Sequence, residues 1–370
     1  MAKLRLEVWP GPSDLTRPSK GPDMTYTFGI DTFGDVTADA SGTKLSHAQV
    51  VRNVVAEAVR AEEVGVDIFN IGEHHRDDYA IPAPDVVLAA IAARTQRIRL
   101  SSAVTVLSSD DPVRVVERFA TVNALSNGRA ELMVGRGSFT ESFPLYGYNL
   151  ADYEDLFNEK LSLLTELLAR NGQPVSWKGG PHTQALNAVT LYPPLEHGPL
   201  PTWVAVGGSP ESVVRAAHYK LPLMLAIIGS PTARFVPFTD LYRRAWEQFG
   251  NDVAAEVGYH SYGYVARTDE EAVADFFDYY VETNSRIGRE RGWRPPSREA
   301  YLYEVKNGAL AVGSPETVAR KIATGMRELG ATRYDLKVSY GSQPHEQNLS
   351  SIELFGTEVI PRVKELLAGE

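Results

Sequence analysis

The chain has 370 residues, of which 43% are hydrophobic, enough for one large core or two modest ones. Its formal net charge of -10 argues against nucleic acid or an anionic membrane surface as a partner. The chain has no cysteine, which excludes disulfides, thiolate catalysis and Cys-ligated metals. No apolar run reaches the roughly 18 residues that a membrane helix needs, and the N-terminus lacks the apolar core of a signal peptide. We therefore expect a cytoplasmic protein.

Residues 1–24 are rich in proline and glycine and show no clear periodicity, so we expect an extended arm there. Eight short β-like segments then alternate with amphipathic helical segments. The expected strands lie near residues 26–33, 67–72, 98–107, 130–134, 202–206, 222–228, 257–265 and 334–339. The expected helices lie near residues 46–64, 84–93, 112–125, 153–169, 210–219, 233–249, 269–287, 315–329 and 351–367. The first helix follows a capping box, Ser46 to Gln49, in which two side chains satisfy free backbone donors reciprocally.

Eight alternating units predict a parallel sheet that closes into a (β/α)8 TIM barrel, as a single domain over residues 25–370. A doubly wound open sheet is the alternative, and it is less favoured because no Gly-x-Gly-x-x-Gly follows the first strand. Residues 171–200 and 288–312 interrupt the alternation. With residues 140–150, we expect them to cover the C-terminal face of the barrel and select a substrate.

The C-terminal ends of barrel strands carry the chemistry in this fold. The polar residues expected there are Asp31, Glu73, His74, His75, Thr105, Ser108, Arg136, Ser138, Ser209, His260 or Tyr264, Ser339 and Tyr340. This set is poor in the carboxylates that metal and glycosidase sites need, and the chain shows no His-x-His pattern at a strand end. We therefore expect no metal, and a metal-dependent barrel hydrolase is a disfavoured alternative.

Arg136 follows a buried strand and lies between Gly135 and Gly137. Glycines let the backbone pass close to a ligand, and a guanidinium offers a planar fork to an anion. The pattern therefore predicts an anion site. The alternative is a tight strand-to-helix turn with a surface arginine.

A second candidate anion site is the turn from Gly207 to Ser212. Ser209 is a good N-cap and Pro210 suits the first helical position. Gly207 and Gly208 would leave backbone N–H groups and the positive helix end free for an anion. We predict phosphate binding there. The similar residues 313–317 follow no clear long strand, and we expect only a well-capped helix.

His74 and His75 are adjacent and therefore point in different directions. For His75 we favour structural packing over catalysis. For His74 two readings are open: packing, or a place in the pocket as a proton-transfer group or hydrogen-bond donor.

Four segments, residues 69–75, 101–107, 127–137 and 206–212, occur in an order and at separations that are familiar. Together they resemble the bacterial luciferase-like flavin-dependent monooxygenases, a (β/α)8 family. The resemblance runs from about Tyr26 to the C-terminal helix. Each motif alone is weak, and the four in register make the match more specific.

The resemblance implies a flavin phosphate near Arg136, Ser209 and Ser212, with Gly207 and Gly208 contributing backbone. It implies that His74 acts on the flavin–oxygen chemistry. It also implies a non-prolyl cis peptide against the flavin ring at the segment that contains Ala103 and Val104.

The implied function is an FMN monooxygenase, in which reduced FMN from a separate reductase reacts with oxygen to oxygenate a small organic substrate. A homodimer is implied too, with residues 46–64 and 112–125 as candidate interface helices. Luciferase itself has a carboxylate where this chain has Gly208, and a reactive cysteine that this chain lacks, so light emission is not expected. The alternatives are an F420-dependent oxidoreductase of the same superfamily and a non-catalytic flavin-binding protein.

Overall fold

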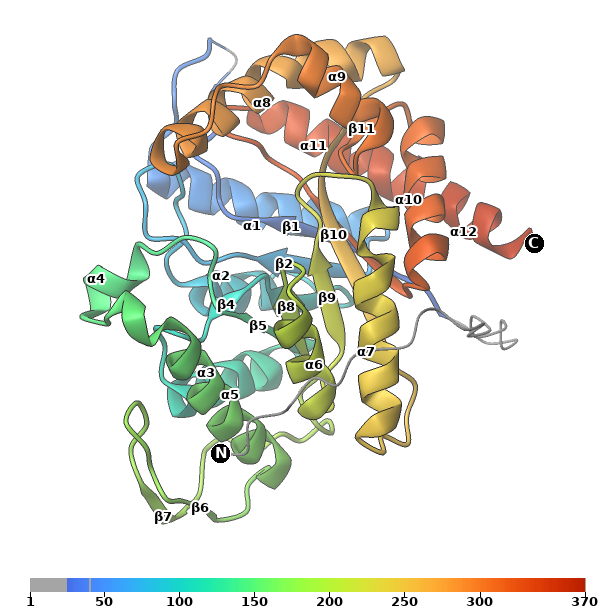
Figure 1. Ribbon diagram of the computed structural model, residues 1–370. Helices are drawn as coiled ribbons and strands as arrows, with labels where there is room; N and C mark the ends of the chain where they lie inside the picture. The colour runs from blue at the N-terminus through green and yellow to red at the C-terminus, as the bar shows by residue number, and fades with distance from the viewer. Residues whose placement is uncertain (1–24, 40, 370) are drawn as a thin grey trace.

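Eight parallel strands close into a barrel in the computed structural model, which describes residues 25–39 and 41–369 (Figure 1). In order around the barrel, they are β1 (Thr27–Thr32), β2 (Ile68–Ile71), β3 (Arg99–Ser102), β5 (Ala130–Gly135), β8 (Thr202–Val206), β9 (Leu223–Ala226), β10 (Val257–Val265) and β12 (Arg333–Lys337). Because β10 pairs with β9 and β12, and β12 also pairs with β1, the eight strands form a closed ring, and the open-sheet alternative is excluded. The expected N-terminal arm, residues 1–24, lies outside the described residues.

Helices pack around the barrel. They are α1 (His47–Glu63), α2 (Pro84–Ala92), α3 (Pro112–Leu125), α4 (Ser142–Tyr146), α5 (Tyr153–Arg170), α6 (Pro210–His218), α7 (Val236–Gln248), α8 (Asp269–Arg291), α9 (Arg298–Asn307), α10 (Pro315–Leu329), α11 (His345–Leu354) and α12 (Ile360–Ala368). Alternate strand residues, such as Phe28 and Ile30, face outward into the hydrophobic core beneath the helices. The strand residues between them face the barrel interior. Among the described residues, no helix is both long and apolar enough to cross a membrane.

The start of α1 realises only half of the expected capping box. Ser46 Oγ accepts a hydrogen bond from the backbone N–H of Gln49 over 3.2 Å. The Gln49 side chain instead donates to Asn53 Oδ1 over 2.8 Å, one turn further along the helix. The Gln49 amide oxygen, which a capping box would offer to the backbone N–H of Ser46, instead accepts from Arg52 over 2.7 Å. A helical neighbour three residues away therefore replaces the free backbone donor.

The segment after β10 covers the C-terminal face of the barrel, as expected for residues 288–312. Figure 1 shows α8 and α9 together at this end of the molecule. Ion pairs hold the last turns of α8 to the loop after β2, from Arg76 to Glu290 over 2.6 Å and from Arg286 to Asp78 over 2.8 Å. Helix α9 was not expected, because Tyr301 is its one buried residue and the segment has no apolar stripe.

The expectation that residues 171–200 also cover this face is wrong. The segment contains the antiparallel pair β6 (Val175–Trp177) and β7 (Leu186–Val189) and lies against α5, where Thr183 Oγ1 donates to Glu159 over 2.5 Å. His197 lies against Gly128, at the N-terminal end of β5. The segment leaves the end of a helix rather than the end of a strand, so it starts at the opposite face of the barrel.

Candidate functional site

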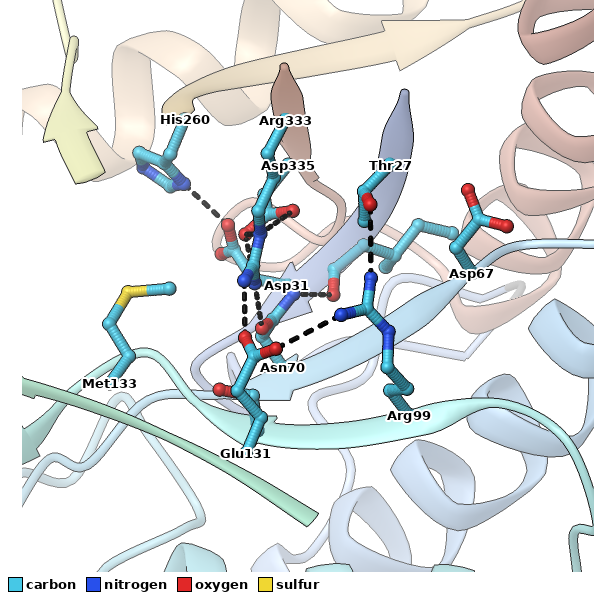
Figure 2. A network of polar contacts seen from close by, with 12 residues as sticks. Thr27, Asp31, Asp67, Asn70, Arg99, Glu131, Met133, His260, Arg333 and Asp335 are labelled. Atoms are coloured by element: carbon cyan, nitrogen blue, oxygen red, sulfur yellow. Dashed lines mark hydrogen bonds and ion pairs between the residues drawn. The ribbon is translucent and has the colours of Figure 1, made fainter. Parts of the chain in front are cut away.

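A charged network around Arg333 lies in the barrel interior near the N-terminal ends of the strands (Figure 2). Arg333 donates to Asp335 and Asn70, over 2.8 Å in each case, and also to Glu131, which accepts a further bond from Arg99. Burial alone would lower the pKa of Arg333, but the carboxylates of Asp335 and Glu131 raise it above its ordinary value. Each buried charge therefore has a partner, and the network is a rigid support for the residues above it.

A floor of small side chains lies one step nearer the strand ends. Ala103, Val104 and Ala205 are half-buried and pack on a layer of Met133, Trp203 and Met224. The Arg333 guanidinium lies 4.9 Å from the centre of the Trp203 ring, which links this layer to the charged network. The Ala103–Val104 peptide bond is cis, as the family resemblance implies for this segment.

Asp31, near the C-terminal end of β1, and His260, in the middle of β10, face each other beside this floor (Figure 2). His260 Nδ1 is hydrogen-bonded to Asp31 Oδ2, and Asp31 Oδ1 is buried without a partner among the described residues. A carboxylate that fixes one ring nitrogen of a histidine leaves the other nitrogen to accept or donate a proton. The sequence placed both residues at strand ends, but could not pair residues 229 positions apart.

His74 lies in a box of aromatic rings at the mouth of the barrel. Its ring stacks on Tyr79 with 4.5 Å between centroids, and the edges of Phe33 and Phe139 complete the box at 5.0 Å. His74 Nδ1 is hydrogen-bonded to Glu141 Oε1 over 2.9 Å, and its side chain is 11% exposed. The geometry fixes the ring while leaving part of it at the surface of the mouth.

The Glu141 carboxylate is the electrostatic partner of this histidine. Burial raises the pKa of Glu141, but the hydrogen bonds from His74 and from backbone groups outweigh it and hold the pKa below its ordinary value. Glu141 is therefore an anion that orients His74. No local pattern predicts this pair, because the two residues lie 67 positions apart on separate loops.

His75 is in a packed and paired position. Its Nε2 is hydrogen-bonded to Glu73 Oε1 over 3.0 Å, and the side chains of the two residues are 7% and 8% exposed. The other oxygen of Glu73 accepts a bond from the backbone N–H of Val106, so the pair ties the loop after β2 to β4 (Thr105–Val106). This is a structural arrangement, and it agrees with the interpretation that the sequence favoured.

Arg136 follows β5 and points along the rim of the mouth. It donates to Glu154, in the first turn of α5, and its guanidinium lies 5.4 Å from the centre of the Tyr153 ring. Arg215 of α6 donates to the other oxygen of Glu154 over 2.9 Å. Two guanidinium groups therefore meet at one carboxylate. The sequence singled out Arg136 by its glycines but missed Arg215, which looks like any arginine on a helix surface.

The turn from Gly207 to Ser212 is built as the sequence predicts. Ser209 caps α6, accepting from the backbone N–H of Ser212 over 3.3 Å, and the two hydroxyl groups are hydrogen-bonded over 2.8 Å. Gly208 has a φ of +96°, a conformation that favours glycine, and a Cβ at Gly207 would meet no atom within 4 Å. The turn is therefore open on its outer side and can admit an anion at the helix end.

A cavity of about 140 Å³ lies at the edge of the mouth, between the loops after β1 and β2 and the C-terminal half of α8. Its walls include Asp35, Tyr79, Glu282 and Arg286. A larger cavity of about 280 Å³ lies away from the strand ends, between α10 and the outer side of β10. Tyr79 lines the first cavity and also stacks on His74 in the aromatic box, so the first cavity is the better candidate for an entrance.

Comparisons with known proteins agree with this arrangement. The family model for luciferase-like monooxygenases matches residues 28–333. The alkanal monooxygenase alpha chain of Photobacterium leiognathi is 24% identical over 361 residues, covering 86% of this chain and 95% of its own.

Two solved structures share the fold at low sequence identity. One is the oxygenating component of 3,6-diketocamphane monooxygenase from Pseudomonas putida, in complex with FMN, with a TM-score of 0.74 and 19% identity. The other is an F420-dependent secondary alcohol dehydrogenase, with a TM-score of 0.70 and 18% identity. Each alignment covers 92% of this chain and 99% of the other.

Proposed function

The chain belongs to the luciferase-like monooxygenase family, and we propose that it is a flavin-dependent oxidoreductase that uses reduced FMN and oxygen to oxygenate a small organic substrate. The observation that carries the proposal is one juxtaposition at the barrel mouth. Val104, in the half-buried floor of Ala103, Val104 and Ala205, lies against Gly135, the residue before Arg136. Arg136 in turn shares Glu154 with Arg215 of α6, the helix that Ser209 caps. The floor of small side chains suits a flat ring, and Arg136 with the open helix end at Ser209 suits a phosphate.

In this proposal Arg136, Ser209 and Ser212 bind the flavin phosphate, with backbone groups of Gly207 and Gly208. Ala103 and Val104 lie against the ring. Bound reduced FMN supplies the electrons for oxygen chemistry, and the protein binds, orients and shields it from water. The ion pairs of α8 with the loop after β2 serve the last task, because they hold a helix across the mouth.

An F420-dependent dehydrogenase is the second candidate. The observation that favours it is the pair of Asp31 and His260, beside the floor. Hydride transfer from an alcohol releases a proton from the hydroxyl group, and a histidine oriented by a carboxylate can accept that proton. The F420-dependent alcohol dehydrogenase of similar fold supports this candidate at the level of the fold alone.

The test is an equilibrium titration of the protein with FMN, riboflavin and F420, followed by admission of air to the protein with reduced FMN. We expect FMN to bind more tightly than riboflavin, and the protein to change the rate at which reduced FMN is reoxidised. Binding of F420 in preference to FMN would select the second candidate. Binding of FMN without any effect on its reoxidation would select a non-catalytic flavin-binding protein. The homodimer and the separate reductase stay predictions.

We assign His74 the role of moving or holding a proton beside the flavin. His74→Ala should leave FMN affinity within about threefold, because the phosphate residues are unchanged, and should lower turnover by about 100-fold or more. Glu141→Gln is the matched variant, since it keeps the size of the partner but removes the charge that orients the ring, and its effect should be smaller and in the same direction. Unchanged turnover in His74→Ala would return this histidine to a packing role.

A further inference from the structure

Arg136 and Arg215 share one carboxylate beside the N-terminus of α6. Arg136 donates to Glu154 Oε1, and Arg215 donates to Glu154 Oε2 over 2.9 Å. The Glu154 side chain is 51% exposed, whereas the side chains of Arg136 and Arg215 are 26% and 12% exposed. Glu154 is therefore the solvent-facing member of the group, and both of its oxygens are engaged by guanidinium groups.

Each arginine has a support that does not depend on Glu154. The Arg136 guanidinium lies 5.4 Å from the centre of the Tyr153 ring, and the Arg215 guanidinium lies 5.4 Å from the centre of the Phe157 ring. A guanidinium over an aromatic face is attracted to the ring. If Glu154 moved away, the two cations would therefore stay close to their present positions, without a counter-ion.

The charges of the group suit a different anion better than they suit Glu154. Two guanidinium groups and one carboxylate leave a net charge of about +1, whereas a phosphate monoester near pH 7 carries about -1.5 to -2. Guanidinium forks bind carboxylate and phosphate oxygens with similar geometry. The guanidinium groups of Arg136 and Arg215 cannot bind Glu154 and a phosphate together in this way, because the two anions would repel each other at the same position.

We propose that Glu154 occupies the anion site of the free protein, and that the flavin phosphate displaces it to bind both Arg136 and Arg215. The inference rests on the proposed function, because it requires a phosphate-bearing flavin at this rim. It adds Arg215 as a second guanidinium ligand, and Glu154 as an internal competitor that weakens flavin binding. Weak binding suits a protein that takes up reduced flavin from solution and releases the oxidised form.

The test compares the affinities of FMN and riboflavin for wild type and Glu154→Gln. Glutamine keeps the size of the side chain but lacks the charge that competes with phosphate. FMN affinity should rise on the order of 10-fold in Glu154→Gln, and riboflavin affinity should not change. Asp155→Asn is the control, because it removes one negative charge from the same exposed helical turn. It should leave FMN affinity within about twofold, since exposed charges interact weakly in salt.

A second variant tests the role of Arg215. In Arg215→Gln, FMN affinity should fall by about 10-fold with riboflavin unchanged, and the gain from Glu154→Gln should shrink in the double variant. Weaker FMN binding in Glu154→Gln would mean that Glu154 positions the arginines, and unchanged binding would mean that it does not compete. Either result overturns this inference, while tighter binding of FMN than of riboflavin to wild type would still support the proposed function. Equal affinities of wild type for FMN and riboflavin would reject both.

Discussion

Helices α6 and α10 begin with nearly the same residues, Gly-Ser-Pro-Glu-Ser at 208–212 and Gly-Ser-Pro-Glu-Thr at 313–317. Each helix has a serine N-cap and a proline at its first position. At α10, however, a carboxylate already fills the helix end. Asp269 Oδ1 accepts from the backbone N–H of Ser314 over 2.6 Å, and Oδ2 accepts from Thr317 Oγ1 over 2.9 Å.

At α6 no carboxylate binds the serine cap among the described residues. The nearby anion, Glu154, binds the two arginines and leaves the helix end free. Both helix ends attract anions for the same physical reason, the free N–H groups and the helix dipole. The local motif therefore specifies a cap, and residues far away in sequence decide whether a carboxylate of the chain fills the helix end or leaves it open to another anion.

Arg136→Ala should have the largest effect on the contrast between α6 and α10, because it removes one of the two arginines that meet at Glu154 beside α6. FMN affinity should fall by about 10- to 150-fold, which corresponds to the roughly 1.5–3 kcal/mol of a hydrogen bond to a charged group. Riboflavin lacks the phosphate and should bind wild type and variant alike. Arg136→Lys should recover part of the loss, because a point charge cannot reproduce the fork. Equal weakening for both flavins would show that Arg136 shapes the pocket in general.

Ser209→Ala and Ser314→Ala test the contrast between α6 and α10 directly, because they remove the same cap from the two helices. Each should lower the free energy of unfolding by about 1 kcal/mol, measured by denaturant titration, since each helix loses an accepted backbone bond. Only Ser209→Ala should also weaken FMN binding, by about 10-fold or less. A loss of FMN affinity in Ser314→Ala, or none in Ser209→Ala, would contradict the assignment of function to α6 alone.

Much of the fold could be predicted from the sequence, because short-range patterns determine it. All eight barrel strands lie within the expected segments or within a residue of them, because strand and helix periodicities are local. The helix caps at Ser209 and Ser314 were also predicted for that reason. Helix α11 begins at His345, six residues before the expected start at residue 351. The first residues of the helix are polar and form no apolar stripe, so the sequence pattern did not reveal them.

The candidate site was predicted only in part. Arg136 and Ser209 could be singled out by their glycine neighbours. The pairs that set the charge of the site join residues far apart: Arg215 to Glu154 across 61 positions, and Arg333 to Glu131 across 202. Such pairs depend on how the barrel closes, and no local pattern encodes them. The joint between Asp269 and α10, across 45 positions, was missed for the same reason.

Asp269→Asn should change stability only slightly, and the pH dependence of that change tests whether the Asp269 carboxylate holds the start of α10. Burial raises the pKa of Asp269, but the hydrogen bonds from Ser314 and Thr317 outweigh it, so the pKa is lowered from its ordinary value of 3.8. A carboxylate with a lowered pKa stabilises the fold above its unfolded pKa, and this contribution is lost as the pH falls through the folded pKa.

At pH 7 Asp269→Asn should therefore lower the free energy of unfolding by at most about 1 kcal/mol, because the carboxylate is exposed. The difference between wild type and variant should shrink as the pH falls below 3.8. FMN affinity at pH 7 should be the same for both, because α10 is not part of the proposed site. Parallel stability curves at all pH values would mean that Asp269 does not hold α10 as a carboxylate, and the contrast with α6 would lose its electrostatic basis.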